Sequence, residues 1–174
     1  MVRGTDFLKG QINNAVAQHD AFVWALEDHE EQAEDLRFRD LCSRHIPYMR
    51  QVQRMLEEYQ SQLAVKTGVG RENGVAARGV ARALADAARE SDFLRLVGDI
   101  VMARQSEETF KTFREAGKMM GYRTLHEIGD TGERQHDAYI KEATRLVQHM
   151  FVEHAQDIDR VAGQSTEVRL DASP

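Results

Sequence analysis

Apolar residues recur at every third or fourth position along most of this chain, and this spacing limits the possible folds more than any other feature. An α-helix turns once in about 3.6 residues, so the spacing predicts amphipathic helices that each bury one stripe of side chains. Ala, Leu, Glu, Arg and Gln dominate the composition and favour helix over sheet. The sequence therefore predicts an all-α protein. The predicted helices cover residues 6–29, 36–64, 91–120 and 124–151.

Turn and capping residues mark the ends of these helices. Residues 28–35 are almost wholly polar and predict the first turn. Ser91 is a plausible N-cap for the third helix, because its hydroxyl can accept a backbone N–H of the first turn. Gly121 can end that helix, because glycine readily adopts the left-handed conformation of a C-cap. Thr124 then begins the fourth helix, and Glu127 completes a capping box.

Pro47 lies inside the second predicted helix. Proline removes one backbone hydrogen bond and disfavours helical geometry at Ile46, so we expect a kink. The alternative is a first helix that continues to about His45 and a new helix that begins at Pro47. That first helix would have about 40 residues and a length of ~60 Å, far more than any partner helix. We therefore favour a kinked second helix.

A long connection separates the second and third helices. Glycines and an asparagine interrupt the pattern at residues 66–74, and the Ala-rich residues 75–89 predict a short extra helix. A bundle whose helices simply alternate up and down needs only a few residues between them. We therefore predict an antiparallel four-helix bundle in which one long crossover joins two hairpins. The bundle is expected to form a single domain over residues 1–160, followed by a polar, aperiodic and flexible tail at 161–174.

Charge and composition argue against several classes of function. The net charge is −6 and no Lys/Arg cluster occurs, whereas a nucleic-acid-binding surface needs concentrated positive charge. No apolar run reaches the roughly 20 residues of a membrane span, and the N-terminus lacks the apolar core of a signal peptide. A cytoplasmic protein is the resulting expectation. The single cysteine, Cys42, fits a reducing compartment.

The two predicted hairpins are related by an imperfect internal repeat. A shift of about 91 positions places the second helix on the fourth and aligns apolar residues with apolar residues. The same shift places His45 on His136 and Cys42 on Glu133. The motif Glu133-x-x-His136 therefore has a counterpart in Cys42-x-x-His45.

Both motifs predict a polar layer in the middle of the bundle. His19 lies on the apolar stripe of the first helix, about as far before the first turn as His45 lies after it. Glu107 and Glu108 occupy a matching level of the third helix, and either could point inward. Imidazole nitrogens and carboxylate oxygens are metal ligands, and residues three apart on a helix share a face. The predicted ligand set is His19, Cys42, His45, Glu107 or Glu108, Glu133 and His136.

This pattern resembles that of the ferritin-like superfamily, particularly rubrerythrin-like domains and the small stress-associated ferritin-like proteins of bacteria. In that family the first and third helices carry a Glu, and the second and fourth carry Glu-x-x-His. The fourth helix matches through Glu133-x-x-His136, and the third through either of its two adjacent glutamates. His19 and Cys42 stand where the family has Glu. The resemblance implies a ferritin-like topology and a role in metal handling, redox chemistry or stress.

Three functions are open for such a layer. A mixed histidine and carboxylate set with few bridging carboxylates favours one metal ion, such as Fe, Zn or Mn, over a pair. The competing interpretation is a non-enzymatic helical scaffold or interaction protein, in which the buried His/Glu layer fixes the register of the helices. A third is a bundle that uses the layer to orient a small molecule. Cys42 is a ligand, a reactive thiol or a small buried hydrophobe. A homodimer is expected on general grounds.

Overall fold

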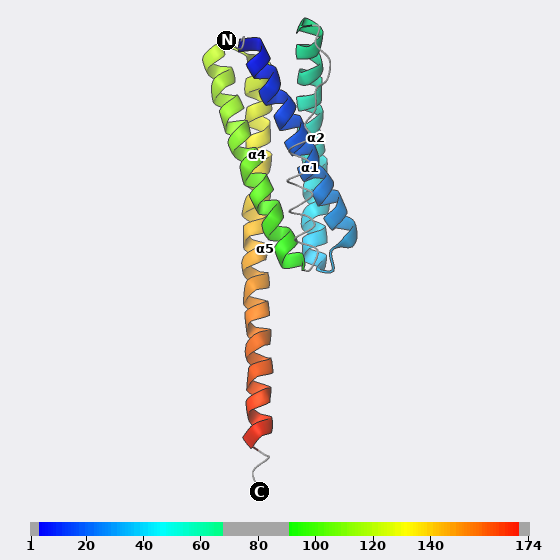
Figure 1. Cartoon of the computed structure of the whole chain (residues 1–174), viewed down its shortest axis with the longest axis vertical. Helices are drawn as coiled ribbons and strands as arrows, with labels where there is room; N and C mark the ends of the chain where they lie inside the picture. Colours follow the sequence, from blue (N-terminus) through cyan, green and yellow to red (C-terminus); the bar gives the residue numbers. More distant parts are fainter. Residues whose placement is uncertain (1–3, 68–90, 171–174) are drawn as a thin grey trace.

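A computed structural model describes residues 4–67 and 91–170, which form four α-helices (Figure 1). No strand occurs in this described part of the chain. The predicted all-α class is therefore confirmed, whereas the extra helix predicted at residues 75–89 lies outside the described residues. The helices are α1 (Gly4–Gln32), α2 (Leu36–Thr67), α4 (Asp92–Met120) and α5 (Arg123–Leu170).

α1 and α2 form a hairpin with a connection of three residues, 33–35. The turn is shorter than the sequence predicted, because α1 continues through the polar stretch to Gln32. The carboxylate of Asp92, in the first turn of α4, accepts the backbone N–H groups of Glu34 and Asp35, each at 2.7 Å. These bonds satisfy two donors of the turn and attach the first hairpin to the beginning of α4.

α2 runs without a break past Pro47. The proline side chain is exposed, whereas Ile46 and Met49 beside it are buried in the core. Proline is tolerated on this solvent-facing side, because the carbonyl that loses its partner there can be hydrated. The alternative in which the second helix begins only at Pro47 is therefore wrong.

The predicted caps of α4 are confirmed. Ser91 has extended backbone geometry, and its Oγ accepts the N–H of Leu94 at 3.2 Å. Gly121 ends the helix in the left-handed conformation, with φ of 70°. The N–H of Tyr122 donates to the carbonyl oxygen of Gly117 at 2.8 Å, as in a Schellman turn. Local residues therefore define both ends of α4.

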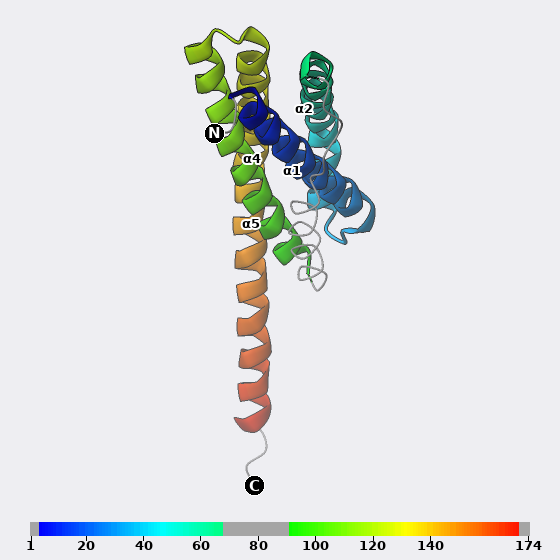
Figure 2. The same cartoon turned by 45° about the horizontal axis from the view of Figure 1, so that its top comes forward.

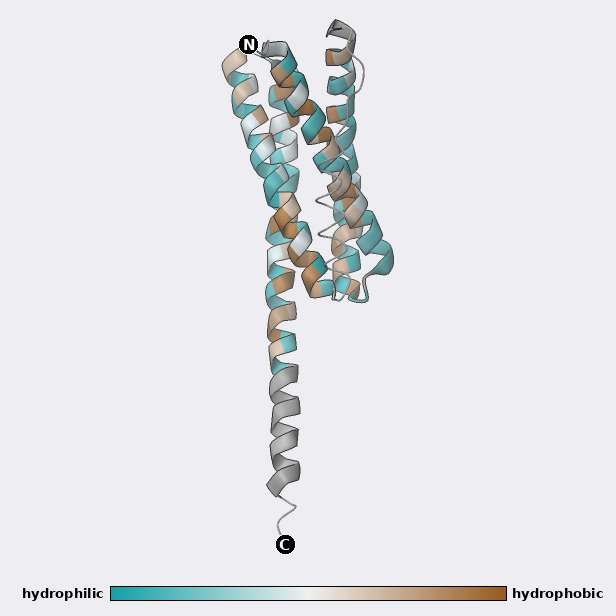
Figure 3. Cartoon of the chain, in the orientation of Figure 1, coloured by the Kyte–Doolittle hydropathy of each residue, from teal (hydrophilic) through white to brown (hydrophobic). Residues whose placement is uncertain are grey.

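The core between the two hairpins contains two apolar clusters. Hydrophobic residues alternate with hydrophilic ones along each described helix, so every helix can turn one face inward (Figure 3). One cluster lies toward the α1–α2 turn and includes Phe22, Phe38 and Tyr139. The other lies toward the α4–α5 turn and includes Leu56 and Phe110. Buried polar side chains lie where the two clusters meet.

Glycines let α4 and α5 approach unusually closely. A Cβ atom at Gly129 would lie closer than 3.0 Å to the backbone nitrogen of Arg114, and one at Gly117 would meet the backbone of His126. At Gly132 it would overlap the ring of Phe110 on α4. Only residues without a side chain fit this contact. The contact therefore sets the separation and register of the second hairpin.

α5 is the longest described helix, with 48 residues against 29 in α4. Among the side chains described, the last buried one in α5 is Met150. The helix continues to Leu170 and extends past the other helices in both views (Figures 1 and 2). Residues 161–170 are therefore helical, where the sequence predicted a loose tail. A helix that is already nucleated gains one internal bond per added residue, so it can extend without an apolar pattern.

The close contact of α4 and α5 can be tested with Gly129→Ala. The added methyl group forces the two backbones apart, so the free energy of unfolding should fall by about 1–3 kcal/mol. Gly98→Ala is the matched control, because Gly98 lies in α4 with open space around its Cα. That change should be neutral or raise the free energy of unfolding by ~0.5–1 kcal/mol. Chemical denaturation followed by circular dichroism measures both, and an equal loss in the two variants would contradict the role of the contact.

Candidate functional site

His19 of α1 and His136 of α5 come together in the middle of the bundle. Their ring centroids are 5.1 Å apart, and both side chains are buried. The His19 ring contacts Phe22 of one apolar cluster and Phe110 of the other, with centroids at 6.5 Å and 5.7 Å. The pair therefore lies at the boundary between the two clusters. Of the predicted polar layer, these two histidines meet at this point of the core.

Hydrogen bonds determine the tautomer of both rings. His136 Nδ1 lies 2.7 Å from the carbonyl oxygen of Gly132, which can only accept, so this nitrogen donates. Gln53 Nε2 donates to Glu57 Oε1 at 2.9 Å, which turns Gln53 Oε1 toward His19 Nδ1, also at 2.9 Å. That nitrogen donates as well. In the neutral rings both Nε2 atoms therefore carry a lone pair, and no described residue donates to either.

Burial makes both imidazoles weak bases. It lowers the pKa of His19 from 6.5 to about 4, and the hydrogen bond that His19 donates to Gln53 offsets part of the effect. It lowers the pKa of His136 to about 3, and the nearby His19 adds to this shift. Phe22 and Phe110 flank His136 with centroids at 5.5 Å and 5.1 Å and bring no opposite charge. Both histidines are therefore neutral at neutral pH.

The predicted carboxylate ligands are held by cations on their own hairpin. Glu107 and Glu108 both accept Lys111 Nζ, at 2.9 Å and 2.8 Å. Glu107 is buried, whereas the Glu108 side chain is 71% exposed and points away from the core. Glu133 accepts the guanidinium of Arg114. Each of these carboxylates is thereby paired with a cation.

His45 and Cys42 of α2 have other surroundings. His45 Nε2 lies 3.3 Å from Glu142 Oε1, and burial lowers its pKa. Its ring packs edge-on against Tyr139 at 5.3 Å. Cys42 is fully buried, and burial raises its pKa, with the charge of Asp99 adding to the effect. It is therefore a thiol rather than a thiolate. Among the described residues, no three His, Cys, Asp or Glu side chains are placed to hold one metal ion.

A second buried polar cluster, which the sequence interpretation missed, joins α1, α4 and α5. His29 Nδ1 donates to Asp99 Oδ2 at 2.9 Å, and the Tyr139 hydroxyl donates to the same oxygen at 3.2 Å. Complete burial raises the pKa of Asp99, and the bond from His29 opposes that shift. Burial also raises the pKa of Tyr139 well above its usual range. Asp99 Oδ1 has no partner among the described residues.

The sequence does carry a signal for this second cluster. Asp99 and Ser106 share a stripe of three-and-four spacing with Leu96, Ala103 and Phe110, all of which are buried. A carboxylate on such a stripe predicts a buried partner. That partner is His29. The predicted turn at residues 28–35 placed His29 at the end of the first helix, so the sequence did not predict that it would be buried.

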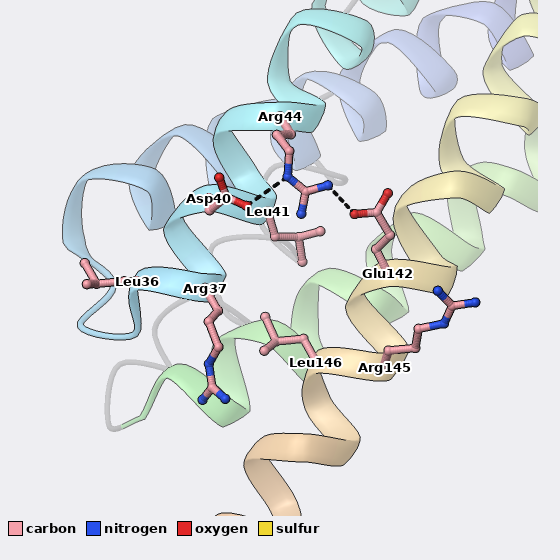
Figure 4. Close-up of a pocket in the computed structure, with 8 residues that line it drawn as sticks. All are labelled: Leu36, Arg37, Asp40, Leu41, Arg44, Glu142, Arg145 and Leu146. Carbon is pink, nitrogen blue, oxygen red and sulfur yellow. Dashed lines mark hydrogen bonds and ion pairs between the residues drawn. The ribbon is translucent and has the colours of Figure 1, made fainter.

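A groove with a volume of about 590 Å³ lies between the first turns of α2 and the middle of α5 (Figure 4). Leu41 and Leu146 form part of its apolar lining, and Arg44 reaches across it to bind both Asp40 and Glu142. Arg145 lines the same groove, and Figure 4 draws no interaction for it. The complete lining is Leu36, Arg37, Asp40, Leu41, Arg44, Glu142, Arg145 and Leu146.

Comparisons with other proteins do not assign the chain to a family. No protein-family model, curated protein or solved structure matches it. Among the described helices, none combines the length and the hydrophobicity needed to cross a lipid bilayer. The function of the chain is therefore inferred from its own residues.

The buried histidine pair predicts a loss of stability in acid. The folded chain resists protonating His19 and His136, whereas the same side chains in the unfolded chain bind protons near pH 6.5. As the pH falls below 6.5 toward 4, the unfolded state binds more protons, and the free energy of unfolding decreases. Each histidine contributes up to ~1.4 kcal/mol per pH unit in this range. Neither contributes a pH dependence well above pH 6.5.

Urea denaturation at a series of pH values measures this effect. His19→Gln removes one of the two titrating groups, so its slope between pH ~4.5 and ~5.5 should be shallower by up to ~1.4 kcal/mol per pH unit. Comparison with the unmodified chain cancels the contributions of Asp99 and the other carboxylates. His149→Gln is the control, because His149 is exposed on α5 and its loss should leave the slope unchanged. An unchanged slope in His19→Gln would disprove the neutral buried pair.

The His29–Asp99 contact predicts a non-additive pair of substitutions. His29→Leu leaves the Asp99 carboxylate buried without its nearest donor, so the free energy of unfolding should fall by about 3–5 kcal/mol. Adding Asp99→Leu removes the stranded charge and should recover at least half of that loss. Equilibrium unfolding of the two single variants and the double variant measures the coupling. Strictly additive losses would mean that the two side chains do not depend on each other.

Proposed function

We propose that this protein is a non-enzymatic helical scaffold or interaction protein, in which buried polar side chains fix the register of a four-helix bundle. The observation that carries the proposal is the pairing of the polar core. His19 bonds to Gln53 between α1 and α2, and His29 bonds to Asp99 between α1 and α4. Each bond forms at one relative height of two helices only, so together they select one arrangement.

We infer an antiparallel bundle with ferritin-like topology. Along α1, residues 13, 19 and 27 bond to residues 60, 53 and 50 of α2, so the two helices run in opposite directions. The pairs 18–106 and 29–99 have the same opposite order between α1 and α4. α2 and α4 then point the same way, so the end of α2 and the beginning of α4 lie toward opposite ends of the bundle. A single long crossover between two hairpins is the ferritin-like connection.

The donor set does not fit a carboxylate-bridged metal pair. Such a centre needs carboxylates that converge with the histidines, whereas Lys111 and Arg114 hold the three glutamates that the sequence singled out. A nucleophilic role for Cys42 also lacks support, because burial raises the pKa of its thiol. In a scaffold, the ion pairs of Lys111 and Arg114 and the buried thiol of Cys42 contribute to packing and need no bound metal.

A second candidate is a single ion of Fe, Zn or Mn at His19 and His136. Their two Nε2 lone pairs favour it, because unpaired buried nitrogens have a cost that a metal ion would remove. Protein sites for zinc usually have at least three protein ligands, and no third His, Cys, Asp or Glu side chain among the described residues is placed to join these two. The scaffold role is therefore the stronger proposal.

Elemental analysis of untagged protein separates the two candidates. The scaffold proposal predicts far less than one equivalent of Fe, Zn or Mn per chain, both as purified and after anaerobic loading with Fe(II) and Zn(II) followed by desalting. Circular dichroism of the same sample verifies that the bundle is folded. Near-stoichiometric metal that is lost in the double variant His19→Gln, His136→Gln, but kept in His149→Gln, would overturn the proposal in favour of a metal site.

A further inference from the structure

Both rings of the buried histidine pair are oriented as metal ligands are. The Nδ1–H of His19 donates to Gln53 Oε1 at 2.9 Å. The Nδ1–H of His136 donates to the carbonyl oxygen of Gly132 at 2.7 Å. Metal-binding histidines usually hold their other ring N–H in such a bond, because it fixes the tautomer and the direction of the ring. Each Nε2 therefore keeps its lone pair, and neither has a hydrogen-bond partner among the described residues.

Packing around the two Nε2 atoms limits the size of anything that joins them. Both atoms have almost no surface open to water, so a water molecule does not fit beside either of them. They also form no hydrogen bond with each other. A single ion with bonds of about 2 Å can join two nitrogens up to ~4 Å apart, which ring centroids at 5.1 Å permit. A bare ion is therefore the occupant that suits this geometry.

The surroundings of the pair favour an ion of low charge. Phe22 and Phe110 flank His136 with ring centroids at 5.5 Å and 5.1 Å, and these side chains bring no negative charge. The cost of burying an ion rises with the square of its charge, so a divalent ion without an anionic ligand is much less favourable than a monovalent one. Within the described residues, no third His, Cys, Asp or Glu side chain is placed to join the pair. The ion must therefore be monovalent and content with two ligands.

We propose that His19 and His136 form a binding site for one Cu(I) ion, which bonds to both Nε2 atoms and joins α1 to α5. Cu(I) has a filled d shell and accepts two nitrogen ligands in a linear arrangement, whereas Zn(II), Fe(II) and Mn(II) take four or more ligands. Imidazole is a common ligand of copper. The shortage of ligands that disfavours Fe, Zn and Mn at this pair therefore does not disfavour Cu(I).

The pair favours Cu(I) over a proton and over Cu(II). A proton binds one nitrogen only and leaves its charge on one buried ring, whereas Cu(I) occupies both lone pairs and shares its charge between two rings. Burial accordingly lowers the pKa of His19 to about 4 and that of His136 to about 3. Cu(II) prefers a tetragonal set of nitrogen and oxygen ligands, which two imidazoles do not supply. The reduced ion is therefore the one that the site stabilises.

The copper site goes beyond the scaffold role and is compatible with it. The ion uses Nε2 of His19, whereas the bond that fixes the register of α1 and α2 uses Nδ1. Binding therefore leaves the His19–Gln53 bond in place. The same bond supports the site, because it keeps the Nε2 lone pair of His19 free for the ion.

Anaerobic titration of the untagged full chain with Cu(I), in competition with the chelator bicinchoninate, tests the site. The unmodified chain should hold about one equivalent of Cu(I). His19→Gln and His136→Gln should each weaken binding at least ~100-fold, because each removes one of two ligands. His149→Gln is the matched control, because this histidine of α5 is exposed and its loss should leave the affinity unchanged. Circular dichroism verifies the fold of each variant.

Further measurements identify the ligands while both histidines are present. X-ray absorption of the Cu(I)-loaded chain should show two nitrogen ligands at about 2 Å and no sulfur. Cys42→Ala should keep the affinity, because the thiol is not a ligand in this site. Gln53→Leu should weaken binding by ~10–100-fold, because it removes the acceptor that orients the His19 ring.

Three results would overturn the copper site: an unmodified chain that cannot compete with the chelator, an unchanged affinity in His19→Gln, or a sulfur ligand in the absorption spectrum. A sulfur ligand would place the ion on Cys42 or on a methionine, because Cu(I) also binds thiolates and thioethers. The scaffold role is tested separately by loading with Fe(II) and Zn(II). Failure of the copper site and failure of the scaffold role are therefore distinguishable.

Discussion

The backbone contact between α4 and α5 is the constraint on which the rest of the bundle depends. Gly129 and Gly117 each lie against backbone atoms of the facing helix, and Gly132 lies against the ring of Phe110. The same Gly132 accepts the Nδ1–H of His136, whose ring packs on Phe110. A change in the separation of the two helices would therefore move the aromatic packing and the histidine together. The close packing of α4 and α5 therefore fixes the positions of the side chains that the second hairpin presents to the first.

Buried polar groups provide the match between the hairpins. An imidazole or carboxylate in the core is costly unless it finds a partner, so each such group excludes arrangements in which the partner is out of reach. Asp99 receives donors from His29 and Tyr139 and thereby links three helices. His19 reaches Gln53 but keeps its second nitrogen unpaired. These residues form separate pairs instead of converging on one point as metal ligands would. Such pairing supports a structural role for the polar core.

The difference between the predicted and observed site has a local cause in each case. Both adjacent glutamates of α4 bind Lys111, which lies three and four residues further along the same helix and is visible in the sequence. Glu133 is held by Arg114 across the close α4–α5 contact, which the spacing of apolar residues does not reveal. The polar neighbours of His29 predict the end of the first helix there, yet α1 continues past it to Gln32. The level of each residue predicted that His19 and His136 belong to one layer, and the structure places these two rings together.

By itself the sequence determined the all-helical class and both ends of α4, because helical periodicity, an N-cap at Ser91 and a left-handed C-cap at Gly121 depend on residues within one or two turns. The continuity of α2 through Pro47 also followed from a local argument about helix length. Only the tertiary structure decided which polar residues meet. Each residue adds about 100° of rotation to a helix, so a small error in axial offset redirects a side chain toward a different neighbour. That offset is set by glycine contacts and competing ion pairs between helices, and no local pattern encodes it.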